Sequence, residues 1–524
     1  MFYNRLFLWV KSNKWICPII AVACYFIMNG VFFYRTADAQ GAKIVFTVLC
    51  VFFWCVICVT YFGIKRKKDF LLKAFLIILL ALGTLHSFVF QPITIPDEEH
   101  HFENSYRYSS LIMLKNPNND SLPIRSADSK EMEKAFSNRL SYQRYLEIVD
   151  GFELFAADKT ETSVTSRYDF TLGSSPPQLF LPSAIGVTVA RLIGLGFYPL
   201  FYLGRLFNFL YFALLSYFAI KITPIGKNVF MAAALLPMTV NIASSYSYDA
   251  GIIGLSFLLL ALCFKTIYTS EQATRKDLIA IAVVVFLLSP CKIVYSFLAI
   301  IVLIIPTTVF SSNRKVRLYK ASVITLSVFT VLLFRFTVLL YLTGIEELGV
   351  VNRGDEQGYY HTVSEFFTNP FGTIAIFFRT IGFFWKFYVS TLVGGSLGWF
   401  QGDIDSPWFI VLAFSTILFL SFLKTPEDDV EINNKHRALF LLIFCIGLFA
   451  IMLGMFTGWT FADEEIIQGI QGRYFLPFLP IIALAIRSNK AVLKRKLQTV
   501  IVFGLFAMNL AYLIRLFSII LTIV

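Results

Sequence analysis

The densest cluster of groups that could do chemistry is Asp97-Glu98-Glu99-His100-His101, which follows a long apolar run. On a helix, Asp97 and His101 share one face because they are four residues apart. A carboxylate backed by an imidazole can act as a general base or can bind a divalent cation. We therefore expect Asp97 to be the catalytic base, with Glu98 and His101 as its catalytic neighbours. The same three residues are the candidate ligands of a divalent cation, Mg²⁺ or Mn²⁺, and the cofactor is otherwise unknown.

The alternative for this cluster is a simple helix start. A proline at the edge and acids in the first turn are favoured there, because the helix dipole attracts negative charge. That interpretation accounts for residues 96–99 but leaves the two histidines unexplained. A structural zinc site is disfavoured, since no third ligand follows at a suitable spacing.

A second cluster, residues 469–477, reads Gly-Ile-Gln-Gly-Arg-Tyr-Phe-Leu-Pro. Glycines let a backbone approach a ligand closely, and the arginine offers a bidentate fork suited to phosphate. We expect Arg473 and Tyr474 to bind the phosphate group of a donor substrate and Gln471 to contact the substrate. The alternative is a glycine-rich turn whose arginine anchors the chain at the membrane interface.

Four further residues are candidates on weaker patterns. Trp399, in a glycine-rich stretch from 394 to 403, could stack on a sugar or belong to a flexible lid. Arg205 and Lys292 are isolated cations between apolar runs, and each is a candidate for the donor phosphate. Asp249 closes a polar turn and is a candidate substrate ligand. The alternative for Lys292 is a side chain that snorkels to the interface, and the other polar turns could be purely structural.

The elements that must position these residues are membrane helices. Of the 524 residues, 57% are hydrophobic and 15% are charged, against about 25% charged in a typical soluble domain. With a mean hydropathy of +0.70, this composition excludes a disordered chain, a cytosolic enzyme and a nucleic-acid binder. The net charge of +12 lies mostly in short clusters between apolar runs, which is the positive-inside pattern and not a nucleic-acid surface. The eight cysteines lie in or beside apolar runs, so no disulfide framework is expected.

The basic clusters set the expected topology of an all-α polytopic membrane protein. With the N-terminus inside, the long acidic loop of residues 92–175 lies outside, and so does the C-terminus. A tight hairpin over 277–310 breaks at Ser289-Pro290, which leaves Lys292 near the outer leaflet. Residues 176–197 and 366–393 are expected along the outer interface or as re-entrant helices. About 13 spans are expected, near 15–34, 44–64, 70–91, 200–221, 228–247, 248–269, 276–291, 292–310, 321–343, 407–424, 438–457, 474–488 and 498–521.

The polar candidates therefore converge on the outer face. Carboxylates beside isolated cations at that depth suit a phosphate-linked lipid substrate: the cations would hold the phosphate leaving group, and a carboxylate would deprotonate an acceptor hydroxyl. No Walker A or Gly-x-Gly-x-x-Gly sequence is present, which favours a lipid-linked donor over a nucleotide. The expected partners are thus a lipid-linked donor, its acceptor and membrane lipid, with no nucleic acid.

The motifs resemble those of a bacterial polytopic membrane family of formerly unknown function. Residues 96–98 followed by His101-Phe102 resemble its Pro-Asp-Glu…His-Phe signature, and residues 395–399 and 471–477 resemble its two later signatures. The resemblance covers roughly residues 70–520. That family is similar to the GT-C glycosyltransferases, in which an acidic motif follows an early span and polyprenyl-phosphate sugars are the donors. Residues 176–177 resemble the start of the interfacial helix that closes the same loop. This sequence departs from that pattern in two ways. Two expected spans precede the one that would be first in a minimal GT-C core, and His100 is an extra histidine beside His101 of the motif.

The resemblance implies a GT-C-like helical bundle with four parts: two N-terminal helices (1–69), a core (70–345) with the outer loop 92–199, an outer or interfacial segment (346–406), and C-terminal helices (407–524). It implies an inverting glycosyltransferase that moves a sugar from an undecaprenyl-phosphate donor to a cell-envelope glycan or lipid-linked acceptor. The reaction would take place on the outer face of the bacterial cytoplasmic membrane. Two alternatives stay open. A flippase for lipid-linked glycan would need a charged path, for which Arg335 and Lys386 are the candidates. A glycan polymerase or ligase would use a lipid diphosphate donor.

Overall fold

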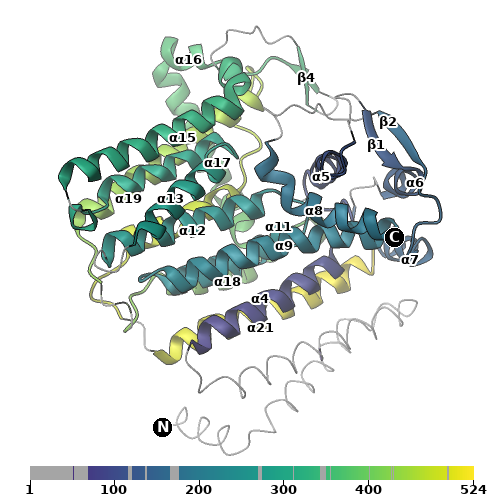
Figure 1. Ribbon diagram of the computed structural model, residues 1–524, viewed down its shortest axis with the longest axis horizontal. Coiled ribbons are helices and arrows are strands. Elements are labelled where there is room, and N and C mark those ends of the chain that lie inside the picture. The colour runs from purple at the N-terminus through teal and green to yellow at the C-terminus, as the bar shows by residue number, and fades with distance from the viewer. Residues whose placement is uncertain are drawn as a thin grey trace, which may run out of the picture.

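The computed structural model of the protein is mostly helical (Figure 1). It describes residues 51, 69–115, 121–135, 139–165, 176–269, 274–310, 312–342, 350–353, 356–399, 402–426, 428, 430–492 and 495–523. The two spans expected near 15–34 and 44–64 lie outside the described residues.

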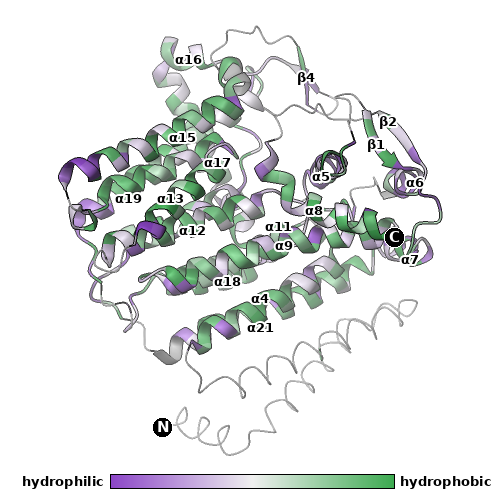
Figure 2. Cartoon of the chain, in the orientation of Figure 1, coloured by the Kyte–Doolittle hydropathy of each residue, from purple (hydrophilic) through white to green (hydrophobic). Residues whose placement is uncertain are grey.

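Seven described helices are long and apolar enough to cross a membrane. Hydrocarbon offers no hydrogen-bond partners, so each helix satisfies its own backbone. Figure 2 shows mostly hydrophobic residues along these elements. They are α4 (Phe70–Val89), α9 (Phe197–Ile222), α12 (Asp249–Tyr268), α15 (Asn313–Leu342, apolar to Phe336), α17 (Pro370–Val393), α19 (Asn434–Gly458) and α21 (Arg495–Ile520).

Among the described residues, the count of about thirteen spans is not confirmed, because several expected spans are short or broken helices. The run at 228–247 divides before Pro237, which cannot continue a helix from the preceding residues. Helix α13 has 14 residues, about 21 Å at 1.5 Å per residue, which is less than the ~30 Å hydrocarbon core. The short elements are α8 (Pro177–Ile193), α10 (Lys227–Ala234), α11 (Pro237–Ala243), α13 (Arg275–Leu288), α14 (Ile293–Ser296), η3 (Phe297–Ile304), η4 (Thr307–Val309), α18 (Trp408–Ser421), η6 (Gly472–Phe478) and α20 (Leu479–Ile486).

The expected hairpin over 277–310 is present. Helix α13 ends just before Ser289-Pro290, and the chain then returns through α14 and η3. The neighbouring side chains of Tyr319 and Lys320 bind the two limbs: the tyrosine hydroxyl donates to the carbonyl of Leu278, and the ammonium donates to that of Leu303. The first residues of α13 and the last residues of η3 therefore lie at the same end of the bundle, which we call the basic end.

The opposite end, which we call the loop end, carries α5 (Glu98–Ile112), α6 (Ser126–Ala135) and α7 (Tyr142–Asp150). An antiparallel pair, β1 (Ser121–Arg125) and β2 (Glu161–Thr165), covers α5 on one side (Figure 1). The amide of Tyr142 donates to the carbonyl of Ile523. The C-terminus thus lies on the same side as the long polar loop, as the basic clusters predict.

Helix α17 differs in part from the prediction for 366–393, because it is one continuous helix long enough to cross a membrane. The segments before and after it nevertheless lie at the loop end. The amide of His361 donates to the carbonyl of Thr460, which follows α19, and Gly398 lies against Thr94 just before α5. A path along the interface therefore stays the prediction for α17. The small elements around it are β3 (Val351–Arg353), β4 (Glu356–Gly358), α16 (Val363–Thr368) and η5 (Gly402–Ile404).

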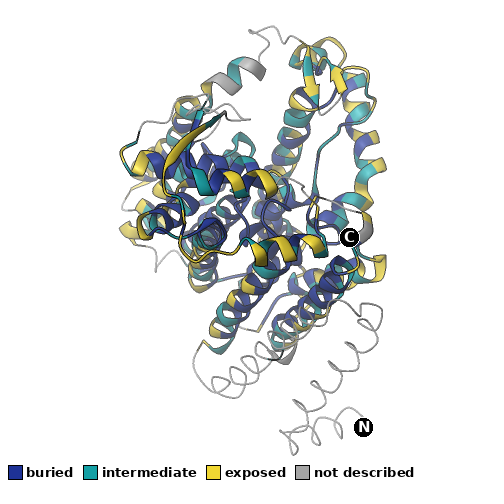
Figure 3. Cartoon of the chain, turned by 90° about the vertical axis from the view of Figure 1, so that its right-hand side faces the viewer, coloured by how far each residue is buried: buried dark blue, intermediate teal, exposed yellow. Residues whose placement is uncertain are grey.

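Buried residues gather inside the bundle (Figure 3). In this core α9 packs against both α12 and α4. Small residues allow close helix contacts there, as in other membrane bundles. A Cβ on Gly83 would come 2.1 Å from the ring of Phe209. This core holds the loop-end termini of α9 and α12 in fixed positions, and both termini carry candidate site residues.

Candidate functional site

Two neighbouring carboxylates, Asp97 and Glu98, begin α5 and face different surroundings. Asp97 adopts a left-handed backbone conformation (φ 61°), which aspartate tolerates better than most residues. Its side chain caps no backbone amide and is 58% exposed. The helix-start interpretation is therefore correct for the position of Asp97, which directly precedes α5, but its carboxylate makes no capping hydrogen bond. The carboxylate is instead left at the surface of the site.

Glu98 is fully buried and forms a bidentate ion pair with Arg205 on α9. The two bonds are 2.8 Å, from Nε to Oε1, and 2.6 Å, from Nη2 to Oε2. The amides of Ile93 and Tyr246 also donate to this carboxylate. Both oxygens are therefore occupied by protein donors.

The remaining donors of Arg205 bind the chain just before α5. Its Nη1 donates to the carbonyl of Phe90 at 2.6 Å, and its Nη2 donates to that of Gln91 at 3.0 Å. This geometry does not fit the catalytic role expected of Glu98 or the phosphate role expected of Arg205. The pair joins α5, α9 and the segment before α12, and it fixes where Asp97 emerges.

A second group of charges comes together from four separate segments. Arg473, at the start of η6, lies between Asp97 and Asp249, with closest N···O distances of 3.6 Å and 3.7 Å. Lys292, in the turn between α13 and α14, donates to Asp249 at 2.7 Å. We call Asp97, Asp249, Lys292 and Arg473 the charge cluster. All four are candidates from the sequence, and the structure brings them together.

Aromatic rings enclose the charge cluster. The ammonium of Lys292 lies 4.9 Å from the ring centroid of Tyr248 and 5.0 Å from that of Tyr474, within cation–π range. The ring of His101 packs edge-on against Tyr248 at 4.3 Å. Burial, together with the nearby His100 and the two cations, holds the pKa of His101 well below its usual value of 6.5. The imidazole is therefore neutral at pH 7.

Three buried atoms around the charge cluster have no hydrogen-bond partner: Nε of Arg473, Nδ1 of His101 and Oε1 of Gln471. A buried polar atom left without a partner costs roughly 1–3 kcal/mol. Arg473 is only 5% exposed, so water does not readily compensate this donor. Of the three, the N–H at Nε of Arg473 is a cationic donor, which a site for an anionic ligand requires.

Gly472 of the second motif places Arg473 by close contact with α17. A Cβ on Gly472 would come 1.9 Å from the carbonyl oxygen of Tyr388. The amide of Gly472 donates to the hydroxyl of Thr391 at 2.7 Å. Gly469 has φ +78°, a conformation that favours glycine.

Arg335 supports Lys292, a role that the sequence did not reveal. Its Nε donates to the carbonyl of Pro290 at 2.8 Å, and its Nη2 donates to that of Cys291. Helix α15 kinks at Arg335 itself (φ −125°, ψ 18°). Arg335, one of the two candidate charges for a flippase path, is thus hydrogen-bonded to the turn that carries Lys292. The only signal in the sequence was an arginine inside an apolar run.

The remaining candidates are less closely placed. Tyr474 contributes its ring to the site, and Gln471 precedes η6. Trp399 is partly exposed at the loop end, and the described contacts do not include it in the charge cluster. Tyr248, whose ring contacts both Lys292 and His101, lies in the polar turn that Asp249 closes and is not among the residues expected from the sequence.

The expected divalent-cation set of Asp97, Glu98 and His101 is not assembled. Among the described residues, no group of three or more His, Cys, Asp or Glu side chains could hold a metal ion. The physical reason is that Arg205 already neutralises Glu98, while Arg473 stands beside Asp97. These three residues therefore do not fit a metal site.

An apolar cavity of about 190 Å³ adjoins the second motif. Its lining comes from α17, α19 and the segment around Gln471, and it includes Tyr388, Phe444, Ile470 and Phe475. A second apolar groove, of about 500 Å³, lies towards the basic end, away from the charge cluster.

These features define a multi-pass helical membrane protein with a charged site at one end of its bundle. Residues 79–482 match the family described as predicted membrane protein (DUF2142), and the chain belongs to that family. No curated protein and no solved structure matches the chain.

Proposed function

We propose that the protein is a GT-C-type glycosyltransferase that transfers a sugar from a polyprenyl-phosphate donor. The acceptor is an envelope glycan or a lipid-linked glycan on the outer face of the bacterial cytoplasmic membrane. The observation that carries the proposal is the charge cluster, in which two cations and an exposed carboxylate from distant segments meet at the loop end.

Arg473 and Lys292 hold the donor phosphate. Lys292 is hydrogen-bonded to Asp249, and Nε of Arg473 lies 3.7 Å from the same carboxylate without a hydrogen bond, so this atom supplies a charged donor for a phosphate oxygen. As the sugar leaves, negative charge develops on that phosphate, and fixed cations stabilise it without reorganisation. The nearby apolar cavity suits part of the donor's isoprenoid chain.

Asp97 acts as the general base. Its exposure gives an acceptor hydroxyl access, and the left-handed turn directs the carboxylate away from the capping position. The hydroxyl oxygen attacks the anomeric carbon, the bond from that carbon to the phosphate oxygen breaks, and the hydroxyl proton passes to Asp97. Polyprenyl phosphate remains on the two cations, and one displacement inverts the anomeric configuration.

The flippase alternative is weakened by the surroundings of its two candidate charges. Arg335 is bound to backbone carbonyls, and Lys386 is exposed on α17 beside the ring of Trp385. A polymerase or ligase with a lipid diphosphate donor would use the same charge cluster, so the donor panel below includes both phosphate types.

The test is a transfer assay with purified protein, a panel of polyprenyl-phosphate and polyprenyl-diphosphate sugars, and envelope glycan extracts. Wild type is compared with Asp97→Asn and with Asp150→Asn, an exposed acid of the same loop. Transfer that is lost only in Asp97→Asn supports the proposal. Absence of transfer from every donor, with lipid-linked glycan moving across proteoliposome membranes, would replace it with the flippase.

A further inference from the structure

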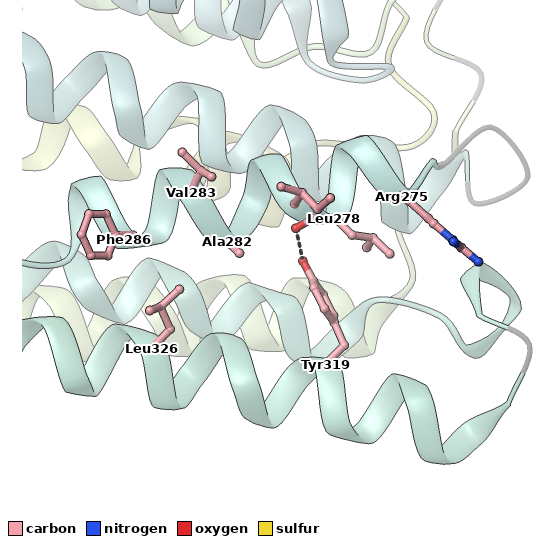
Figure 4. Close-up of a pocket in the computed structure, with 8 residues that line it drawn as sticks. Arg275, Leu278, Ala282, Val283, Phe286, Tyr319 and Leu326 are labelled. Atoms are coloured by element: carbon pink, nitrogen blue, oxygen red, sulfur yellow. Dashed lines mark hydrogen bonds between the residues drawn. The ribbon is translucent and has the colours of Figure 1, made fainter.

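An apolar groove of about 500 Å³ lies between α13 and α15 (Figure 4). Ala282, Val283 and Phe286 line it from α13, and Leu326 lines it from α15. The small side chain of Ala282 leaves the hollow between its larger neighbours. The hydrogen bond from Tyr319 to Leu278 joins the two helices near the basic end.

The groove opens at the basic end beside a cluster of cations. Arg275 lines this opening. Tyr319 is hydrogen-bonded to Leu278 near the start of α13, and Ser327 is hydrogen-bonded to Ser289 at its end, so α13 and α15 run parallel. Arg275 is therefore level with the first turn of α15. The first five residues of α15 carry three more cations, Arg314, Lys315 and Arg317.

Among the residues that the structure describes, Asp277 is the acid nearest in sequence to Arg275, and it already has a cationic partner. Asp277 accepts two hydrogen bonds from the ammonium of Lys265, at 2.8 Å and 2.9 Å, and it caps α13 through Thr274. Arg275 thus places a cation at the end of an apolar groove, and the described acid beside it, Asp277, is bound to Lys265.

We propose that this groove binds one anionic phospholipid, with an acyl chain along α13 and the headgroup phosphate at Arg275. The groove faces lipid, since Ile279 and Val283 are 64% and 51% exposed on that face of α13. Charge complementarity selects an anionic headgroup over a zwitterionic one, with about 1 kcal/mol for each basic residue near the membrane surface. The site lies at the opposite end of the bundle from the charge cluster, so it stands independently of the proposed transfer reaction.

Native mass spectrometry of the purified full chain tests the proposal, with phosphatidylglycerol and phosphatidylcholine of the same acyl chains as probes. Wild type is expected to retain one phosphatidylglycerol in preference to phosphatidylcholine. Arg275→Gln, an exposed position, should lower this preference about fivefold, which is ~1 kcal/mol at one basic residue. Lys435→Gln, an exposed cation at the start of α19, should leave the preference unchanged.

Filling the groove separates a specific site from the general lipid annulus. Ala282→Phe should abolish retention of the bound lipid, whereas Val328→Phe, on an exposed part of α15 outside the groove lining, should not. Equal retention of the two lipids by wild type would overturn the proposal. Retention that is unchanged in Ala282→Phe would overturn it as well.

Discussion

Asp97 and Glu98 are neighbours in the sequence, and each lies beside an arginine from a distant segment. The Glu98–Arg205 pair is fully buried, with bonds of 2.6–2.8 Å and backbone partners that occupy the carboxylate and the guanidinium. The Asp97–Arg473 contact is 3.6 Å, its carboxylate is exposed, and Nε of the arginine has no hydrogen-bond partner. One pair is complete within the protein, and the other leaves capacity for a ligand.

This difference separates two uses of the same residue types. A buried ion pair requires full hydrogen bonding, because the desolvation of both charges is otherwise not repaid. A ligand site requires the opposite, namely charges that the fold orients but does not saturate. The Glu98–Arg205 pair fixes the position of α5. Asp97, which precedes α5, therefore lies at the surface beside Arg473.

The largest expected effect comes from breaking the saturated pair. Arg205→Met leaves the carboxylate of Glu98 buried without a counter-charge, which should cost about 3–5 kcal/mol of unfolding free energy. Denaturant or thermal unfolding in detergent measures it. The double variant Glu98→Gln with Arg205→Met should recover part of the loss, because no bare charge remains. Wild-type stability in Arg205→Met would contradict a structural role for the pair.

The unsaturated arginine should behave in the opposite way. Arg473→Gln should reduce transfer about 100-fold, since a charged donor to the leaving phosphate is lost. Its unfolding free energy should stay within about 1 kcal/mol of wild type, because Asp249 keeps its bond to Lys292. Arg379→Gln, an exposed arginine on α17, is the matched control and should alter neither quantity. An Arg473 variant that unfolds but still transfers sugar would reverse the assignment.

Arg335 should act through Lys292, with a smaller effect. Arg335→Gln frees the turn at Pro290 and Cys291, and we expect a rise in the KM for the donor that lowers kcat/KM about tenfold. Arg335→Lys should restore part of this loss. The double variant with Lys292→Gln should be no worse than Lys292→Gln alone, because the two residues act on one contact. Additive losses in this cycle would show that Arg335 acts elsewhere.

The smallest expected effect is a pH dependence of stability from His101. Its folded-state pKa lies well below 6.5, because burial disfavours the charged imidazole. The unfolded chain therefore binds a proton at a higher pH than the folded protein does. This contribution is fully present above pH 6.5 and is lost as the pH falls. Between pH 6.5 and 5.5 the loss is about 1 kcal/mol. Unfolding of His101→Phe across this range should lack that component, and an identical slope in both proteins would contradict it.

Much of the site could be predicted from isolated charges beside apolar runs. Asp97, Asp249, Lys292 and Arg473 are uncommon near hydrocarbon, so each signals a partner or a ligand. Their convergence followed from the topology of the basic clusters. The hairpin break at Ser289-Pro290 could also be predicted, because proline interrupts a helix.

The different roles of Asp97 and Glu98 could not be predicted. They depend on the left-handed turn at Asp97 and on Arg205, which lies 107 residues further along the chain. The residues around Asp97 predict neither its left-handed backbone conformation nor the pairing of Glu98 with Arg205. Span counting had a similar limit, because hydrophobicity does not distinguish a crossing helix from a broken or short one such as α10 with α11.

The most direct test compares Asp97→Asn with Glu98→Gln, two isosteric changes at adjacent positions, by transfer kinetics and unfolding on the same preparations. We predict that Asp97→Asn binds donor and unfolds like wild type, with turnover reduced by a factor of about 100 or more. Glu98→Gln should instead lose stability, while the remaining folded protein retains most of its turnover per molecule. Full turnover in Asp97→Asn, or loss of turnover without loss of stability in Glu98→Gln, would contradict this account.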